Sequence, residues 1–149
     1  MKIQYKKGNL FDDLSKDIIY LHACNAQGHW GAGIATQFKK FFPKAFKDHK
    51  MMMNNPGDGY LVGHDDYKIG CLITSRFYGE RKDPPKKILV QTYIAVQNML
   101  NTISDKEITI YSPKINSGYF ATPWEATEKV IIRACEKTDK KINWVVWEL

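Results

Sequence analysis

The residues that could do chemistry gather in one short stretch, HACNAQGHWGAGIAT, at positions 22–36. His22 and His29 can exchange protons at neutral pH, because an unperturbed imidazole has a pKa of about 6.5. Asn25 can donate and accept hydrogen bonds. Cys24 carries a potential nucleophile, but the run lacks the arginine-bearing CxxxxxR loop of thiol phosphatases, which favours packing as its role. Polar side chains before a glycine turn and a helix start are typical of an anion or nucleotide site.

A second stretch, INSGYFATPWE at positions 115–125, repeats these ingredients. Ser117 and Gly118 predict a turn, and the backbone amides of 117–121 could form a nest for phosphate oxygens. Thr122 is the expected N-cap of the next helix, with Pro123 at its first position. A pure capping loop would need no ligand. Two such loops, each after a strand, favour a phosphate site.

Strand and helix patterns alternate along the chain, and this alternation must position the two stretches. Strands are expected at residues 2–6, 17–23, 60–64, 68–75, 107–113 and 141–149. Helical patterns cover residues 31–42, 43–53, 89–103 and 122–134. The order predicts an α/β fold with a largely parallel or mixed central sheet. Both glycine-rich loops should then lie at one edge of the sheet and form a two-loop pocket.

Composition limits the class of protein. With 149 residues, 44% hydrophobic and 26% charged, the chain should form one globular domain over residues 1–149. No apolar run is long enough for a bilayer, and no secretory signal is evident. Three cysteines without a CxxC pair predict reduced thiols in the cytoplasm, with the nucleus as a second location. No His/Cys spacing indicates zinc, so neither a metal nor a cofactor is expected.

The net charge of +6 raises the question of nucleic acid. The lysines, however, are spread over the chain in pairs, which is typical of a solvated surface rather than a binding stripe. A basic field would also attract a small anionic ligand. Charge alone therefore does not choose a partner, and nucleic acid is not the expected one.

Four segments together resemble the macrodomain family over essentially the whole chain: KGNLF (7–11), HACNAQGHWGAGIATQFKKFFP (22–43), INSGYFATPWE (115–125) and VVWEL (145–149). The sequence is most similar to the small macrodomains of the yeast ADP-ribose-1″-phosphate phosphatase type, and next to the terminal ADP-ribose protein glycohydrolase type. The resemblance implies a three-layer α/β/α sandwich with a mixed central sheet. It also implies ADP-ribose or a derivative as the ligand.

The resemblance implies a role for several residues. Asn9 would contact the adenine edge, Asn25 the distal ribose, and Trp147 would lie near the adenine or serve only in core packing. The amides of 31–35 and 117–121 would hold the diphosphate, and Arg76 beside the distal ribose could clamp a phosphate. The expected ligand-binding residues are Asn9, Leu10, Ala23, Asn25, Trp30, Gly31, Ala32, Gly33, Ile34, Ala35, Thr74, Ser75, Ile115, Asn116, Ser117, Gly118, Tyr119, Phe120 and Trp147.

Departures from the family pattern reduce the number of activities that the resemblance implies. Ala35 stands where the commonest hydrolase branch has an Asp, and Ser75 and Phe120 stand where the glycohydrolase branch has its Lys and Asp. His22 matches a histidine of the phosphatase type. The expected activity is therefore hydrolysis of the terminal phosphate of ADP-ribose-1″-phosphate, with His22 in proton transfer and Asn25 as the second catalytic residue. His29 is a second candidate for proton transfer and is expected to be more exposed. The plainer alternative is that His22 is not catalytic and only forms hydrogen bonds in the pocket wall.

Other functions stay open at this point. The chain could instead remove ADP-ribose from protein or nucleic acid, or bind ADP-ribose without catalysis. The expected partners are ADP-ribose, ADP-ribose-1″-phosphate and ADP-ribosylated protein, with no membrane contact. A monomer is the expected state.

Overall fold

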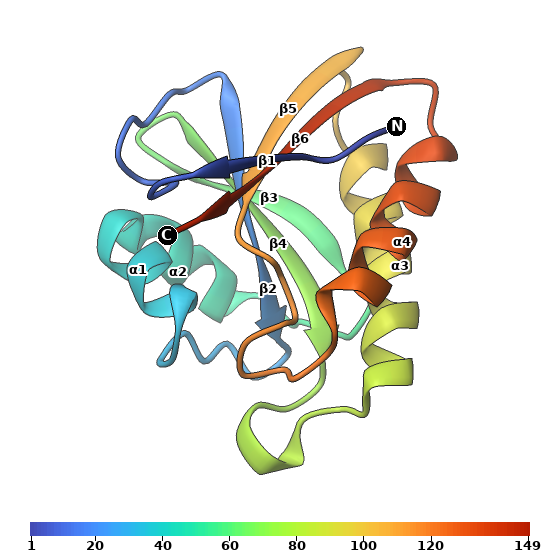
Figure 1. The fold of residues 1–149 in the computed structure, drawn as a ribbon. Coiled ribbons are helices and arrows are strands. Elements are labelled where there is room, and N and C mark those ends of the chain that lie inside the picture. Colours follow the sequence, from blue (N-terminus) through green and yellow to red (C-terminus); the bar gives the residue numbers. More distant parts are fainter.

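A computed structural model describes residues 1–149. Its centre is a six-stranded sheet in the order β1-β6-β5-β2-β4-β3 (Figure 1). All neighbouring strands run parallel except β3 and β4, so the sheet is mixed. The strands are β1 (Gln4–Lys7), β2 (Ile18–Asn25), β3 (Gly59–His64), β4 (Tyr67–Ser75), β5 (Glu107–Ser112) and β6 (Lys141–Glu148).

Helices cover both faces of this sheet. Figure 1 shows α1 and α2 on one side and α3 and α4 on the other, which makes three layers. The expected α/β/α sandwich with a mixed central sheet is confirmed. None of the helices is long and apolar enough to cross a membrane. The helices are α1 (Ile34–Phe41), α2 (Pro43–Met51), α3 (Pro85–Asn101) and α4 (Trp124–Glu136), with a 3-10 turn η1 (Gly79–Arg81) before α3.

The alternating side chains of β2 supply two separate cores. Ile19 and Leu21 belong to a cluster of 18 buried residues under α3 and α4. Tyr20 and Cys24 belong to a cluster of 11 under α1 and α2. Because successive side chains of a strand point to opposite faces, one central strand can anchor both layers.

Some helix boundaries differ from those expected. The third helix begins at Pro85, four residues before the expected Leu89, because proline is well suited to the first helical turn. The fourth begins at Trp124, with Pro123 rather than Thr122 at the N-cap position. The Thr122 hydroxyl donates to the carbonyl of Phe120 instead, at 3.2 Å. This threonine therefore closes the preceding loop and does not cap the helix.

Gly59 marks the closest approach between the sheet and α3. A Cβ atom at this position would lie 1.9 Å from the backbone oxygen of Ala95. We expect Gly59→Ala to destabilise the fold by about 2–3 kcal/mol, because the backbone of α3 must move away. Gly63→Ala, four residues along the same strand, is the control, since its Cβ would meet only Tyr67 at 3.8 Å. Urea unfolding measures both, and equal stabilities would contradict this packing.

Candidate functional site

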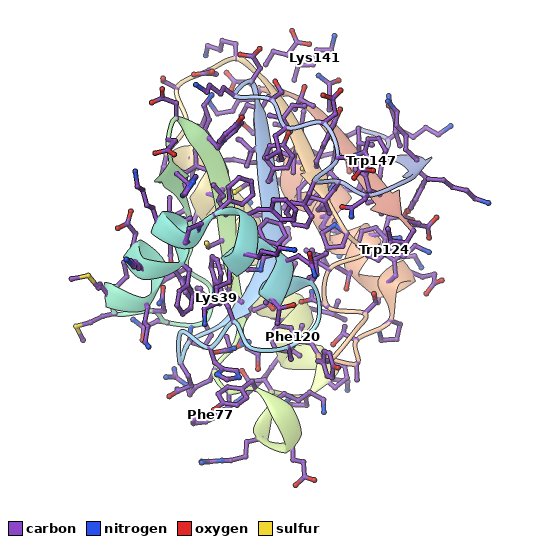
Figure 2. The ribbon with its side chains drawn as sticks, turned by 90° about the vertical axis from the view of Figure 1, so that its left-hand side faces the viewer. Lys39, Phe77, Phe120, Trp124, Lys141 and Trp147 are labelled. Atoms are coloured by element: carbon purple, nitrogen blue, oxygen red, sulfur yellow. The ribbon has the colours of Figure 1, made fainter.

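A cavity of about 640 Å³ lies beyond the carboxyl ends of the parallel strands. Its walls come from the loop between β2 and α1 and from the loop between β5 and α4. Figure 2 labels Phe120 in the second of these loops and Trp147 in β6, two aromatic residues of the lining. The structure thus brings the two glycine-rich loops together, as the sequence predicts.

Asn25 ends β2 and fixes the shape of the first loop. Its side-chain oxygen accepts hydrogen bonds from the backbone N–H groups of Gln27 and His29, at 3.0 and 3.2 Å. Its amide nitrogen donates to the carbonyl of His29, at 2.8 Å. One amide N–H remains for a ligand, since Asn25 also lines the cavity. Asn25 is therefore a positioning residue for the turn.

The first loop presents a row of free backbone donors. The N–H groups of Trp30, Gly31, Ala32 and Gly33 donate no hydrogen bond within the protein. The loop passes directly into α1, whose N-cap residue Gly33 has a φ of 60°. A helix N-terminus carries a partial positive charge, and free N–H groups beside it attract anions.

Asn116 anchors the second loop to the rest of the fold. It is buried with a φ of 67°, accepts a hydrogen bond from the hydroxyl of Thr74 and donates one to the hydroxyl of Thr92, both at 2.9 Å. Thr74 and Thr92 belong to β4 and α3, so the loop is held from two elements. Thr74, expected at the ligand, acts here as support for Asn116.

The second loop also carries unpaired backbone donors. The N–H groups of Gly118, Tyr119 and Phe120 donate to no acceptor in the protein. The two loops meet across the cavity mouth, where a Cβ atom on Gly33 would lie 3.1 Å from the ring of Tyr119. Two sets of free amides therefore belong to facing walls. This arrangement suits a ligand with two linked phosphates.

His22 does not line the cavity. It is fully buried, its ring stacks on Phe38 at 4.0 Å, and Trp30 packs edge-on at 4.4 Å. Burial lowers the pKa of His22, so the imidazole is neutral at neutral pH. The ring of His22 lies within the core under α1 and does not contact the cavity. His22 therefore has no direct route for the expected proton transfer to a ligand there. Its catalytic role stays a prediction that the geometry does not favour.

The imidazole in the cavity wall belongs to His29. It is exposed and stacks on Tyr78, with ring centroids 4.1 Å apart. Tyr78 and Gly79 follow β4 and complete this end of the cavity. The expected exposure of His29 is confirmed, and its place beside the ligand space makes it the better candidate for proton transfer.

Most expected ligand-binding residues line the cavity. Their contacts with a ligand stay predictions, but the structure brings these side chains and loops together: Ala23, Asn25, Trp30, Ala32, Gly33, Ile34, Ala35, Ile115, Asn116, Ser117, Gly118, Tyr119, Phe120 and Trp147. Trp147 also packs on Tyr111, at 5.4 Å, so it lines the cavity and packs in the core at the same time, while its expected place near the adenine stays a prediction. Its indole nitrogen is buried without a hydrogen-bond partner.

Five expected ligand-binding residues lie outside the cavity lining. The side chain of Asn9 accepts a hydrogen bond from the N–H of Phe11, and Leu10 is buried in the core under α1. Gly31 lies against the ring of His29. Ser75 donates to the carbonyl of Phe77 and accepts from the N–H of Asp83, so it shapes the loop after β4. Thr74 is the support described above, and Arg76, the expected clamp, is also absent from the lining.

Sequence reasoning missed one charged pair in the wall. Lys114 and Glu148 form an ion pair of 2.5 Å, and both line the cavity beside Trp147. Lys114 directly precedes the INSG segment and Glu148 directly follows VVW, and this adjacency could have indicated that both line the cavity. Tyr78, Gly79 and Pro113 were missed as well, and nothing in the sequence around Tyr78 points to a cavity.

Comparisons with known proteins agree with this geometry. Residues 21–131 match the Macro domain family. The ADP-ribose 1″-phosphate phosphatase of Candida albicans is 36% identical over 146 residues, which cover 87% of this chain and 91% of that protein. The phosphatase of the same name from Candida glabrata is 32% identical and covers 99% of this chain and 98% of its own. The macrodomain of Mycobacterium tuberculosis DarG has the same fold, with a TM-score of 0.79 at 18% identity, covering 99% and 98% of the two chains. The chain belongs to the Macro domain family.

Proposed function

We propose that this protein binds ADP-ribose-type ligands and hydrolyses the terminal phosphate of ADP-ribose-1″-phosphate, releasing ADP-ribose and phosphate. The observation that carries the proposal is the pair of facing loops with unpaired backbone amides around one cavity. Relatives with the name of this activity align over nearly the whole chain, at up to 36% identity.

The strand order supports the proposed direction of the ligand along the cavity. Trp147 belongs to β6, whereas Tyr78 follows β4, and these strands are three positions apart in the sheet. At about 4.8 Å per strand, the two ends of the cavity lie about 14 Å apart. An extended nucleotide fits this span, with the adenine toward Trp147 and the distal ribose toward Asn25 and His29. The diphosphate then lies between the two rows of amides.

The reaction needs a proton acceptor and a proton donor near the phosphorus. An attacking water loses a proton as its oxygen bonds to phosphorus, and the ribose oxygen needs a proton as its bond to phosphorus breaks. The exposed imidazole of His29 lies at the expected ribose end of the cavity. It is placed to take the first proton or to supply the second, while the amides stabilise the phosphate oxygens.

Removal of ADP-ribose from protein or nucleic acid is the second candidate function. The cavity lining supports it less well, because it carries few acidic side chains. Glu148 is the one carboxylate among the lining residues, and it is paired with Lys114. Ala35 and Phe120, where other branches carry an Asp, present no acid to the ligand. Binding without catalysis is the remaining alternative, and a turnover assay separates the three.

The setting of this activity is also a proposal. We infer that the chain acts as one domain of residues 1–149 and as a monomer, in the cytoplasm, with the nucleus as a second location. Its partners would be the small molecules ADP-ribose and ADP-ribose-1″-phosphate, and ADP-ribosylated protein as a binding target. The three cysteines are all unpaired, which fits a reducing compartment.

Removal of one loop amide tests the binding mode. Gly118 lines the cavity, and its N–H has no acceptor in the protein. Gly118→Pro lacks this N–H, whereas Gly118→Ala keeps it, and a Cβ atom at this position meets nothing within 4 Å. We expect proline to weaken ADP-ribose binding about tenfold, or about 1.4 kcal/mol, and alanine to change it little. Calorimetric titration measures both variants. Wild-type affinity in the proline variant, with its fold intact by circular dichroism, would contradict the role of this amide.

Histidine variants test the catalytic assignment. His29→Ala should lower kcat for phosphate release about a hundredfold, because a positioned acid or base contributes at least about that factor. His64→Ala is the control, since His64 lies outside the cavity lining. His22→Phe keeps an aromatic ring against Phe38 and should retain most of the activity. Loss of phosphate release in a His22→Phe variant that is folded by circular dichroism, with His29→Ala active, would restore His22 as the catalytic histidine and refute His29.

A further inference from the structure

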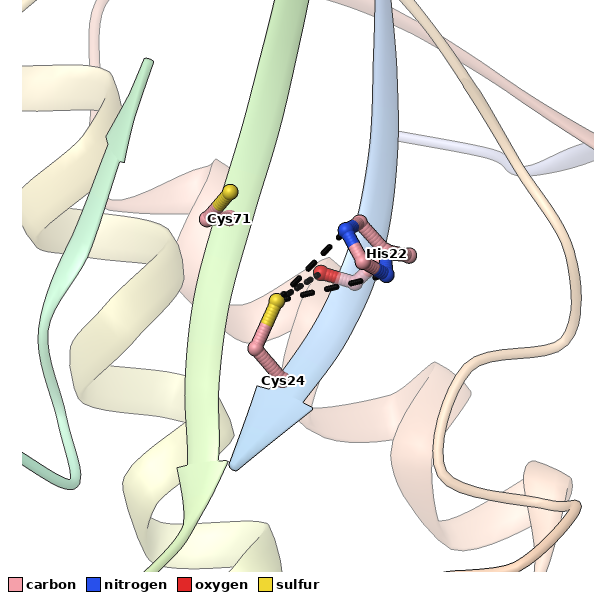
Figure 3. Close-up of side chains that lie close together, drawn as sticks. All are labelled: His22, Cys24 and Cys71. Carbon is pink, nitrogen blue, oxygen red and sulfur yellow. Dashed lines mark hydrogen bonds between the residues drawn. The ribbon is translucent and has the colours of Figure 1, made fainter. Parts of the chain in front are cut away.

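Three metal-ligating side chains lie together on one face of the sheet, outside the mechanism described above. His22 and Cys24 are two residues apart on β2 and therefore point to the same side. Cys71 of β4 is the parallel register partner of His22 and joins them there (Figure 3). The sulfur and nitrogen atoms of the three lie within 4.8 Å of one another, and all three residues are buried.

A fourth residue faces the same group from the covering layer. His49 of α2 is fully buried, and its ring packs on Trp30, the indole that also contacts His22. His49 is also among the groups, after Cys24 and His22, that lower the pKa of the Cys71 thiol. The Nε2 atom of His49 is buried and has no hydrogen-bond partner. An unpartnered buried nitrogen costs free energy, so it needs an explanation.

The hydrogen bonds around Tyr60 fix which nitrogen of His49 carries the proton. The Tyr60 hydroxyl donates to the side-chain oxygen of Asn54, at 2.5 Å. The same hydroxyl lies 2.6 Å from Nδ1 of His49 and must accept there, so Nδ1 carries the proton. Nε2 is then an unprotonated acceptor with no donor. This is the state of a metal-binding imidazole whose other nitrogen is held by an oxygen.

We propose that His22, Cys24, His49 and Cys71 form a binding site for one Zn²⁺ ion in the core between the sheet and α1–α2. Two cysteines and two histidines are a common tetrahedral zinc set. Zinc–sulfur and zinc–nitrogen distances of about 2.3 and 2.0 Å place neighbouring ligand atoms about 3.3–3.8 Å apart. The Cys24 sulfur already lies 3.5 Å from Nε2 of His22. The ligand atoms of His22, Cys24 and Cys71, which lie within 4.8 Å of one another, need to close in by about 1 Å, and Nε2 of His49 has to join them from outside this group.

Charge balance favours such an ion in this core. Both thiols must lose their protons on binding, so each Zn²⁺ releases two protons. The two thiolates and the divalent ion then sum to zero, which removes the cost of burying a net charge. Cys24 also lines the cavity, so the ion has a route from solvent through the cavity floor. With four protein ligands the site is closed, and its role is to stabilise the fold rather than to join the reaction.

Co²⁺ titration of the chelator-treated full chain tests the site, because tetrahedral Co²⁺ reports thiolate ligands by its absorption. We expect thiolate charge-transfer bands that saturate at one Co²⁺ per chain, disappear on addition of Zn²⁺ and accompany release of two protons. Cys71→Ser should weaken binding at least tenfold. Cys135→Ser, the third buried cysteine, lies outside the group and should bind as the wild type does.

His49→Phe keeps an aromatic ring against Trp30 and should also lose binding, which covers the case that Cys71→Ser does not fold. Zn²⁺ should raise the melting temperature of the wild type and of Cys135→Ser, but not that of His49→Phe. A folded wild type without thiolate bands at millimolar Co²⁺ would overturn the site. Bands retained in both Cys71→Ser and His49→Phe would overturn it as well.

Discussion

The parallel pairing of β2 with β4 and β5 is the constraint on which the rest of the structure depends. It aligns the carboxyl ends of these strands, so the loop after β2 and the loop after β5 open at one edge of the sheet. It also buries β2 on both faces, with Ile19 and Leu21 toward one helical layer and Tyr20 and Cys24 toward the other. Both the cavity and the His/Cys group follow from this one pairing.

The cavity recognises charge mainly through neutral groups. Its donors are backbone amides of residues 30–33 and 118–120, and the one lysine in the wall, Lys114, is neutralised by Glu148. Amides held by a rigid frame need no reorganisation to receive phosphate oxygens. Asn25 and Asn116 provide that frame, because the side-chain amide of each forms hydrogen bonds that fix the shape of a loop. Preorganisation of the two loops is therefore the main contribution of these two asparagines.

Local sequence was sufficient for the layers and for both loops, because alternation, glycine turns and helix patterns are short-range signals. Contacts between distant segments could not be predicted from local sequence patterns. The sequence around His22 shows which chemical groups are present but not which face of the sheet the His22 side chain lies on. Only the position of α1 places this ring in the core. Tyr78 reaches the cavity through a turn without a motif, and Cys71 meets Cys24 only through strand register. No zinc spacing is visible in the sequence, because Cys71 is far along the chain from His22 and Cys24 and joins them only through the pairing of β2 with β4.

The two-loop cavity is proposed to bind ADP-ribose-1″-phosphate and to hydrolyse its terminal ester. Phosphate release by the purified protein tests it most directly, with ADP-ribose identified as the second product. We expect one phosphate and one ADP-ribose for each substrate molecule consumed, with inhibition by added ADP-ribose at the same site. A protein that neither releases phosphate nor binds ADP-ribose in calorimetry would contradict it.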